Sequence, residues 1–212
     1  MFSWKENGRK QMRLEGYDYS QPGMYFINPV TEDRVEWFGA VRNPVSAVGV
    51  DPCVDPHTDP GRAVMVLNAY GKIVETFWKK LPEKFPGIKL DEFVTMPNHF
   101  HGIIEIVSRV KGVKRGSTHG STPTSGAKVE FKGIPDFIQW FKTMTTNAFY
   151  KEYANGHRFG KSGRIGKLWQ RDYYEHIVRG KGDLERIRKY IRDNPTKWER
   201  DRNNTNPHPV IS

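Results

Sequence analysis

The stretch IKLDEFVTMPNHFHGIIEIV, residues 88–107, contains the most informative fold signal in this chain. Two runs of strand-forming residues, 88–95 and 99–107, are separated by Met96-Pro97-Asn98, and this pattern predicts a β-hairpin with a proline-containing turn. The second run opens with two histidines at positions where a buried strand normally carries Val or Ile. These histidines are either an isolated oddity or part of a site.

His99 and His101 are expected to point to one face of the sheet, because side chains two apart on a strand lie on the same side. Phe100 then points the other way, into the core. Two neutral imidazoles side by side can hold one divalent ion, but two histidines bonded to their neighbours would give the same pattern. A metal site needs further ligands, and the other histidines considered for it are His119, His157 and His176.

The remaining segments complete a regular order of elements. We expect strands at 23–27 and 168–178 and helices at 63–81, 134–153 and 183–194, with 36–41 as either a short strand or the edge of a turn. With the hairpin, the order is strand, helix, strand, strand, helix, strand, and then an extra helix. This order predicts the α+β class, as a ferredoxin-like β-α-β-β-α-β antiparallel sheet backed by two helices.

One domain is expected over residues 1–212. Four segments are predicted to lie outside its packed core: a basic N-terminal arm at 1–20, an irregular proline-rich loop at 43–60, a flexible basic loop at 108–130 and a loose polar tail at 201–212.

The composition favours a polyanionic partner. The net charge is +10, from 34 Lys and Arg against 24 Asp and Glu, and 13% of the residues are aromatic, which suits stacking on unpaired bases. A soluble basic protein with ordinary core aromatics would look the same. The single cysteine, Cys53, excludes an internal disulfide framework and a cysteine-based zinc site. No apolar run approaches the roughly 20 residues that cross a membrane, so we expect a location in a reducing cytoplasm.

The helix at 183–194 carries a second candidate group. Tyr190 and Asn194 are four residues apart and share a face at the margin of an apolar stripe. A phenol beside a metal ion can act as a nucleophile, and an amide oxygen can complete the ligand set. Alternatively, Tyr190 flanks the core and Asn194, before Pro195, ends the helix.

Taken together, four stretches resemble the single-tyrosine HUH transposases of insertion sequences, and most closely their REP-associated tyrosine transposase branch. These stretches are MRLEGYDYSQPGMYF (12–26), LDEFVTMPNHFHGIIEI (90–106), LWQRDYYEHIVR (168–179) and LERIRKYIRDNPTKW (184–198). They occur in the family's order over nearly the whole chain. Two features depart from it: Pro29 interrupts the first strand, and the segments at 43–60 and 108–128 look variable.

The resemblance implies a chemistry for each matching residue. The family's HUH element matches His99-Phe100-His101, its nucleophile matches Tyr190, and its third protein ligand matches Asn194. It further implies a Mg²⁺ or Mn²⁺ ion and cleavage of single-stranded DNA beside a hairpin. Attack by the tyrosine would leave a 5′-phosphotyrosine link and a free 3′-OH, and the step can be reversed to rejoin strands.

Several basic and aromatic residues are candidates for binding the nucleic acid. Those near the site are Arg171, Arg179, Arg186, Lys189 and Arg192, and those in the stretch that resembles the family's hairpin-contacting segment are Arg9, Lys10, Arg13 and Tyr17. Any of the cations could instead be ordinary surface charge. Tyr173 and Tyr174 are rivals for the nucleophile, although a strand position near Trp169 suits packing or base stacking better.

Three functions follow, and they differ in their chemistry. The leading one is a strand transferase that cuts and joins DNA at hairpin-forming repeats; the second is a transposase-derived protein that binds structured DNA or RNA without cutting. The third is a metal-dependent phosphodiesterase that uses water. The expected oligomeric state is a monomer or a homodimer.

Overall fold

The central feature of the molecule is a four-stranded antiparallel sheet. The structure, a computed structural model, describes residue 14 and residues 16–43, 62–108, 133–156 and 167–205. The sheet has the order β4-β5-β1-β6 and is built from β1 (Gly23–Asn28), β4 (Ile88–Thr95), β5 (Phe100–Ile106) and β6 (Tyr174–Ile177). Helix α1 (Ala69–Lys79) follows β1 and helix α3 (Ile134–Gly156) precedes β6 in the chain. This is the ferredoxin-like arrangement, so the predicted α+β fold class is confirmed.

The predicted hairpin forms from β4 and β5. Thr95 pairs with Phe100, and the Met96 N–H closes the turn by donating to the carbonyl of His99 at 2.8 Å. A β-bulge interrupts β4 between Leu90 and Phe93. The hairpin therefore delivers the two histidines at the start of β5, one of the two inner strands of the sheet.

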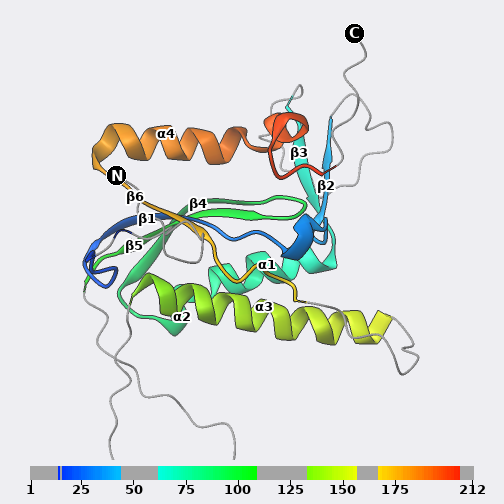
Figure 1. The fold of residues 1–212 in the computed structure, drawn as a ribbon, viewed down its shortest axis with the longest axis horizontal. Helices are drawn as coiled ribbons and strands as arrows, with labels where there is room; N and C mark the ends of the chain where they lie inside the picture. Colours follow the sequence, from blue (N-terminus) through cyan, green and yellow to red (C-terminus); the bar gives the residue numbers. More distant parts are fainter. Residues whose placement is uncertain (1–13, 15, 44–61, 109–132, 157–166, 206–212) are drawn as a thin grey trace, which may run out of the picture.

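Helices α1 and α3 cover one face of the sheet (Figure 1). Aromatic rings fill the space between the layers: the ring centroid of Trp78 lies 4.6 Å from that of Phe100 and 5.5 Å from that of Phe141. Phe100 thus points into the helix-backed core, as the strand alternation predicted. The close approach of Trp78 to β5 depends on Gly102, because a Cβ atom there would lie 2.4 Å from Trp78 Cζ2.

The first helix begins later than the predicted start at residue 63. Val64–Leu67 forms strand β3 instead, which pairs with β2 (Gly39–Arg42) in a separate two-stranded sheet. A run of β-branched and long apolar residues suits a strand, and pairing with β2 prevails over the helical spacing. Helix α1 starts after Asn68, whose side chain accepts hydrogen bonds from the N–H groups of Tyr70 and Gly71.

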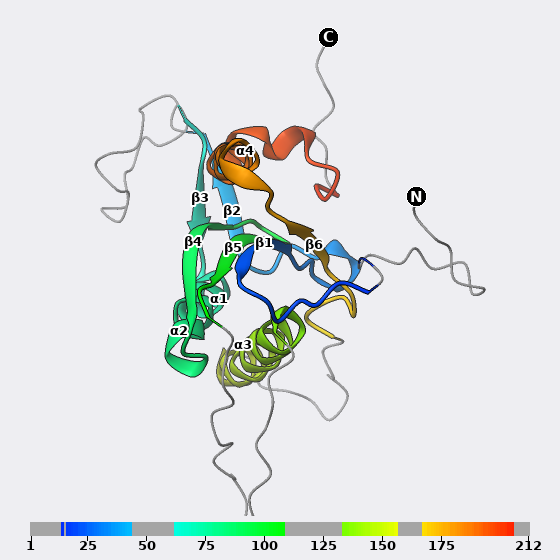
Figure 2. The same ribbon diagram turned by 90° about the vertical axis from the view of Figure 1, so that its left-hand side faces the viewer.

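Helix α4 (Gly180–Asp193) lies on the opposite face of the sheet from α1 and α3 (Figures 1 and 2). Its Ile187 and Ile191 are buried against Phe26 of β1 and Ile103 of β5. Burying an isoleucine side chain contributes about 1.5–3 kcal/mol, so this small cluster accounts for much of the attachment of the helix.

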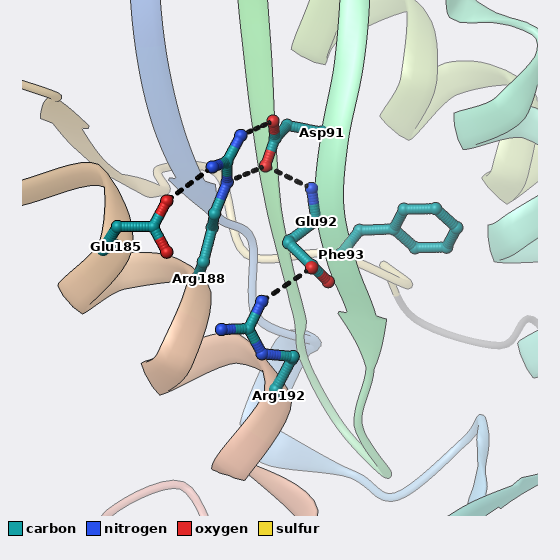
Figure 3. A pocket seen from close by; sticks show the side chains of 6 residues that line it. All are labelled: Asp91, Glu92, Phe93, Glu185, Arg188 and Arg192. Atoms are coloured by element: carbon teal, nitrogen blue, oxygen red, sulfur yellow. Dashed lines mark hydrogen bonds and ion pairs between the residues drawn. The ribbon is translucent and has the colours of Figure 1, made fainter. Parts of the chain in front are cut away.

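Two arginines of α4 add polar contacts to the bulged part of β4 (Figure 3). Arg188 binds Asp91 through Nε at 2.8 Å and Nη2 at 2.5 Å, and it also binds Glu185 at 2.6 Å. Arg192 binds Glu92 at 2.8 Å. These side chains line a hollow of about 410 Å³ in which each of the three acids is bound to an arginine. The hollow therefore belongs to the helix–strand contact.

The other elements are short: η1 (Glu32–Arg34), α2 (Leu81–Lys84) and η3 (Pro195–Arg200). The last strand is shorter than the predicted 168–178, because Leu168 and Trp169 pack in the core and Trp169 forms only an isolated bridge with Thr31. None of the helices in the described ranges is long and apolar enough to cross a membrane. Most of the predicted arm (1–20) and of the predicted loops at 43–60 and 108–130 lies outside the described residues, which omit 1–13, 44–61 and 109–132.

Candidate active site

The two histidines meet on the sheet face that α4 covers. His99 and His101 are fully buried, and their Nε2 atoms lie 2.9 Å apart. The ring of His101 stacks on Phe26 of β1, with centroids 5.5 Å apart and an angle of 18° between the planes. His99 lies against Trp198 of η3. Both rings are thus held in place from the side, and their Nε2 atoms converge on one region.

Asn98 determines which nitrogen of His99 carries the proton. The Asn98 Nδ2 group donates to the backbone carbonyls of Arg34 at 2.8 Å and Asn203 at 2.7 Å, and this fixes the orientation of the amide. Asn98 Oδ1 is left to accept a hydrogen bond from His99 Nδ1 at 2.9 Å. In the neutral ring, Nε2 of His99 then carries the free lone pair, as a metal ligand requires.

Burial keeps both imidazoles neutral at pH 7. It lowers the pKa of His99 to about 4, against the opposing influence of the Asp201 carboxylate and the Asn194 amide. Burial, with His99 as the next cause, lowers the pKa of His101 well below its usual range. Neutral imidazoles are the form that binds metal ions.

Asp201 is a third potential metal ligand that sequence reasoning missed. The ligand atoms of His99, His101 and Asp201 all lie within 4.8 Å of one another. Asp201 follows η3 in the segment that was predicted to be a loose tail from 201, and this prediction is wrong for residues 201–205. Asn203 is buried there, and its N–H donates to Asp201 Oδ1 at 2.7 Å. No spacing motif links this aspartate to a histidine pair 100 residues earlier.

Asn194, the ligand that the sequence suggested, also lies at the site. It is the C-terminal cap of α4, and it is close enough to His99 and Tyr190 to affect the pKa of both. Its Oδ1 is buried and accepts no hydrogen bond from the described part of the chain. Asn194 therefore ends the helix, as one interpretation held. Its role as a metal ligand stays a prediction.

The donor set fits a divalent cation. Two nitrogen ligands that are each about 2.1 Å from an ion lie about 3 Å apart when they subtend a right angle at it. The Nε2 atoms of His99 and His101 are 2.9 Å apart. A carboxylate from Asp201 and an amide oxygen from Asn194 are hard ligands of the kind that Mg²⁺ and Mn²⁺ take. This buried group can hold a metal ion.

Tyr190 of α4 lies at the edge of this group. Its ring centroid is 5.1 Å from that of His101, and 39% of the residue is exposed, so it borders both the buried ligands and the solvent. Burial raises the pKa of the phenol, and Asp201 adds to the effect; Asn194 and Arg202 act in the opposite direction. The phenol is therefore protonated at neutral pH in the protein without a metal ion.

Comparison with known proteins places the chain in a family. The scan found no family model that matches. The chain is 33% identical, over 193 residues, to a Haemophilus influenzae protein described as uncharacterized, and the match covers 91% of each chain. The chain belongs to the family of this Haemophilus protein.

Two solved structures are similar to this member of the family. One is a REP-associated tyrosine transposase bound to a REP hairpin, at 15% identity and a TM-score of 0.48, covering 88% of this chain and 74% of that one. The other is a Deinococcus radiodurans protein described as a putative transposase, at 16% identity and a TM-score of 0.37, covering 85% and 96%.

The predicted DNA-binding cations on α4 are already engaged with acids. Arg186 pairs with Asp183, Lys189 with Asp193 at 3.0 Å, and Arg192 with Glu92 at 2.8 Å. All three cations remain exposed, so a phosphate would compete with these acids for them. Arg171 and Arg179 are exposed as well.

Of the four N-terminal residues predicted to contact nucleic acid, the structure describes Tyr17. Arg9, Lys10 and Arg13 lie outside the described residues. Tyr17 packs on Tyr19, with ring centroids 4.9 Å apart, and its hydroxyl lies 3.4 Å from that of Tyr25. It is therefore part of an aromatic cluster at the margin of the core.

The rival residues are less well placed for chemistry than Tyr190. Tyr174 faces the same side of the sheet but contacts Phe26 rather than a histidine, and Tyr173 lies under the ammonium group of Lys142. His176 binds Asp183 at 2.8 Å, near the start of α4. His119 and His157 lie outside the described residues.

Proposed function

We propose that this protein is an HUH-type single-tyrosine transposase, a metal-dependent endonuclease and strand transferase that cuts and rejoins single-stranded DNA at hairpin-forming repeats. One observation carries the proposal. The Nε2 atoms of His99 and His101 face each other near the half-exposed phenol of Tyr190 and the amide oxygen of Asn194, which has no partner in the described part of the chain. Buried polar atoms without partners are rare in proteins that have no ligand to satisfy them.

His99, His101 and Asp201 would hold Mg²⁺ or Mn²⁺, with Asn194 as a further oxygen ligand. The bound ion would neutralise charge on the scissile phosphate and lower the cost of forming the phenolate. Asn98 keeps the lone pair of His99 Nε2 available. The ligands come from β5, the end of α4 and the turn after η3, so a folded chain is needed to assemble them.

Tyr190 is the proposed nucleophile. Its hydroxyl oxygen forms a bond to the phosphorus atom, and the bond between phosphorus and the 3′ oxygen of the preceding nucleotide breaks. The phenol gives up its proton, and the departing oxygen takes one up to become a 3′-OH. The DNA stays attached through a 5′-phosphotyrosine ester, which another 3′-OH can attack to rejoin strands.

The substrate is proposed to be unpaired DNA next to a hairpin, a partner that the sequence resemblance suggests and the charge of +10 supports. Single strands present both the phosphate and the base faces to the site, whereas a duplex encloses the bases. We place this activity in the bacterial cytoplasm, in a monomer or a homodimer.

The decisive experiment looks for a covalent protein–DNA band. The purified full-length protein is incubated with Mg²⁺ and a labelled single-stranded hairpin taken from beside its own gene, and the products are separated on a denaturing gel. Tyr190→Phe and His99→Ala are run in parallel, with Gln139→Ala as a control on the exposed side of α3.

A band that forms with the wild type and Gln139→Ala, and is lost in the two site variants, is the expected result. Cleavage that survives in Tyr190→Phe would mean that water is the nucleophile. Tight binding without cleavage on several hairpins, in Mg²⁺ and in Mn²⁺, would favour a protein that binds structured nucleic acid without cutting it.

A further inference from the structure

A second hollow, of about 200 Å³, opens beside the histidine pair. It lies between the end of β1, the segment before β6 and the turn after η3. Its lining includes Asn28, Arg34, Gln170, Tyr174, Arg202 and Asn203. Pockets for drug-sized ligands usually measure about 300–1,000 Å³, so this one suits a single small ring system.

One residue that lines the hollow, Asn203, also contacts the proposed metal site. Asn203 accepts a hydrogen bond from Asn98 through its carbonyl and donates its N–H to Asp201. Tyr174, on the other side, lies with its ring 6.2 Å from that of Phe26, the residue on which His101 stacks. A group in this hollow would therefore be a direct neighbour of a phosphate held at the histidines.

Asn28, in the wall of the hollow, has a buried amide oxygen with no partner among the described residues. Asn28 is 5% exposed, and its Oδ1 accepts no hydrogen bond from any residue that the structure describes. Asn28 is the last residue of β1 and pairs with Tyr174 across the sheet. An unsatisfied buried amide oxygen is costly, and a ligand with a suitably placed N–H would remove that cost.

The other lining groups suit a flat heterocycle rather than a bare anion or an apolar chain. Tyr174 is 41% exposed, so its ring offers a stacking surface. The amides of Asn28, Gln170 and Asn203 can donate to and accept from the edge of a base, and Gln170 is oriented by donating to the carbonyl of Thr31 at 3.1 Å. Arg34 and Arg202, against one acid, Asp172, give the lining a net positive charge for a phosphate.

We propose that this hollow binds one unpaired nucleobase of the DNA strand, adjacent to the phosphate that is cut, with its face on Tyr174 and its edge on Asn28. This inference rests on the proposed function, and it adds a position at which the protein itself holds the strand in register. A base fixed next to the phosphate would set which phosphodiester bond meets Tyr190.

The test measures binding, so that it does not depend on cleavage. Full-length protein carrying Tyr190→Phe is titrated into a labelled hairpin oligonucleotide in which one nucleotide at a time, on either side of the cut, is replaced by an abasic site. We expect one position within about two nucleotides of the cut to weaken binding about tenfold or more, because stacking of one base is worth about 1–3 kcal/mol.

The pocket variants Tyr174→Leu and Asn28→Ala should then bind the intact strand about as weakly as the protein with an unaltered pocket binds the abasic strand. Replacing the sensitive nucleotide by an abasic site should lower the affinity of these variants little further. Gln139→Ala is the control and should keep the full abasic effect. A thermal melt of each pocket variant distinguishes a lost contact from a misfolded protein. Tyr174→Leu, at a residue that is 41% exposed, should melt close to the wild type and still bind weakly.

The possible outcomes separate this inference from the function on which it rests. If the wild type forms the covalent band but no abasic position is sensitive to the pocket variants, the pocket proposal is overturned and the transposase proposal stands. If DNA is not bound but an RNA strand shows one sensitive position that the pocket variants abolish, the base pocket stands and the DNA function falls. If neither nucleic acid is bound, both fall.

Discussion

Arg188 of α4 donates two hydrogen bonds to the carboxylate of Asp91 in β4, from Nε at 2.8 Å and from Nη2 at 2.5 Å. This pair joins the helix that carries the proposed nucleophile to the bulge of β4, the strand next to β5. The bulge turns two adjacent acids, Asp91 and Glu92, toward α4. Together with the apolar contacts of Ile187 and Ile191, this pair determines where Tyr190 stands relative to His101.

Removing the charge of Asp91 should loosen α4. Asp91→Asn is expected to lower the melting temperature by about 2–4 °C, because a two-point arginine–carboxylate pair becomes a weaker neutral contact. It should also slow formation of the covalent band. Glu75→Gln is the matched control, since it breaks the exposed pair with Lys79 on the far helix α1. Equal shifts in the two variants would show that the Asp91 pair has no special role.

The stability contributed by Asp183 should disappear in acid. A hydrogen bond from the backbone N–H of Arg179, followed by contacts with His176 and Arg186, holds the pKa of Asp183 well below its usual range. The unfolded carboxyl has a pKa of about 3.9, so the stabilisation is complete above about pH 5 and is lost as the pH falls toward the lower folded pKa.

Thermal melts of the wild type and Asp183→Asn between about pH 2 and 7 would measure this effect. The difference in melting temperature between the two proteins should be largest near neutral pH and shrink steadily in acid. A difference that grew as the pH fell would contradict the sign of this shift.

Asn98 should control metal binding without being a ligand. Its amide orients His99 and ties it to Arg34 and Asn203, and loss of such a partner typically lowers metal affinity 10–100-fold. We therefore expect Asn98→Ala to weaken Mn²⁺ binding in calorimetry by about that factor. Asn68→Ala is the control, because it removes the N-cap of α1 and lowers stability by about 1 kcal/mol far from the site. If both variants bind Mn²⁺ alike, Asn98 has only a structural role.

Asp201 and Asn194 can be ranked as metal ligands by the same measurement. Asp201→Ala should reduce Mn²⁺ affinity more than Asn194→Ala, since it removes the carboxylate from a set whose other members are neutral. Tyr190→Phe should leave the affinity close to that of the wild type. An unchanged affinity in Asp201→Ala, together with a large loss in Asn194→Ala, would restore the ligand set that the sequence motif implied.

Where sequence patterns and structure disagree, a distant contact is the reason. Residues 64–67 have the spacing of a helix, but they pair with Gly39–Arg42 as strand β3. Leu168 and Trp169 look like the start of a strand, but they pack in the core, where Trp169 donates to Thr145 at 2.9 Å. Neither partner is near in sequence, and local preference is too weak to decide such cases.

The hairpin, the opposite directions of Phe100 and the two histidines, and the buried stripe of α4 can all be predicted from local sequence, because they depend on the fixed repeats of strand and helix. Which polar groups meet depends on the folded arrangement of distant segments. Asp201 reaches the histidines because Trp198 and Asn203 are buried beside them, and the hollow at Asn28 exists because the end of β1, the start of β6 and the turn after η3 meet at one place. Such meetings depend on packing between segments far apart in the chain, and no local pattern of residues encodes them.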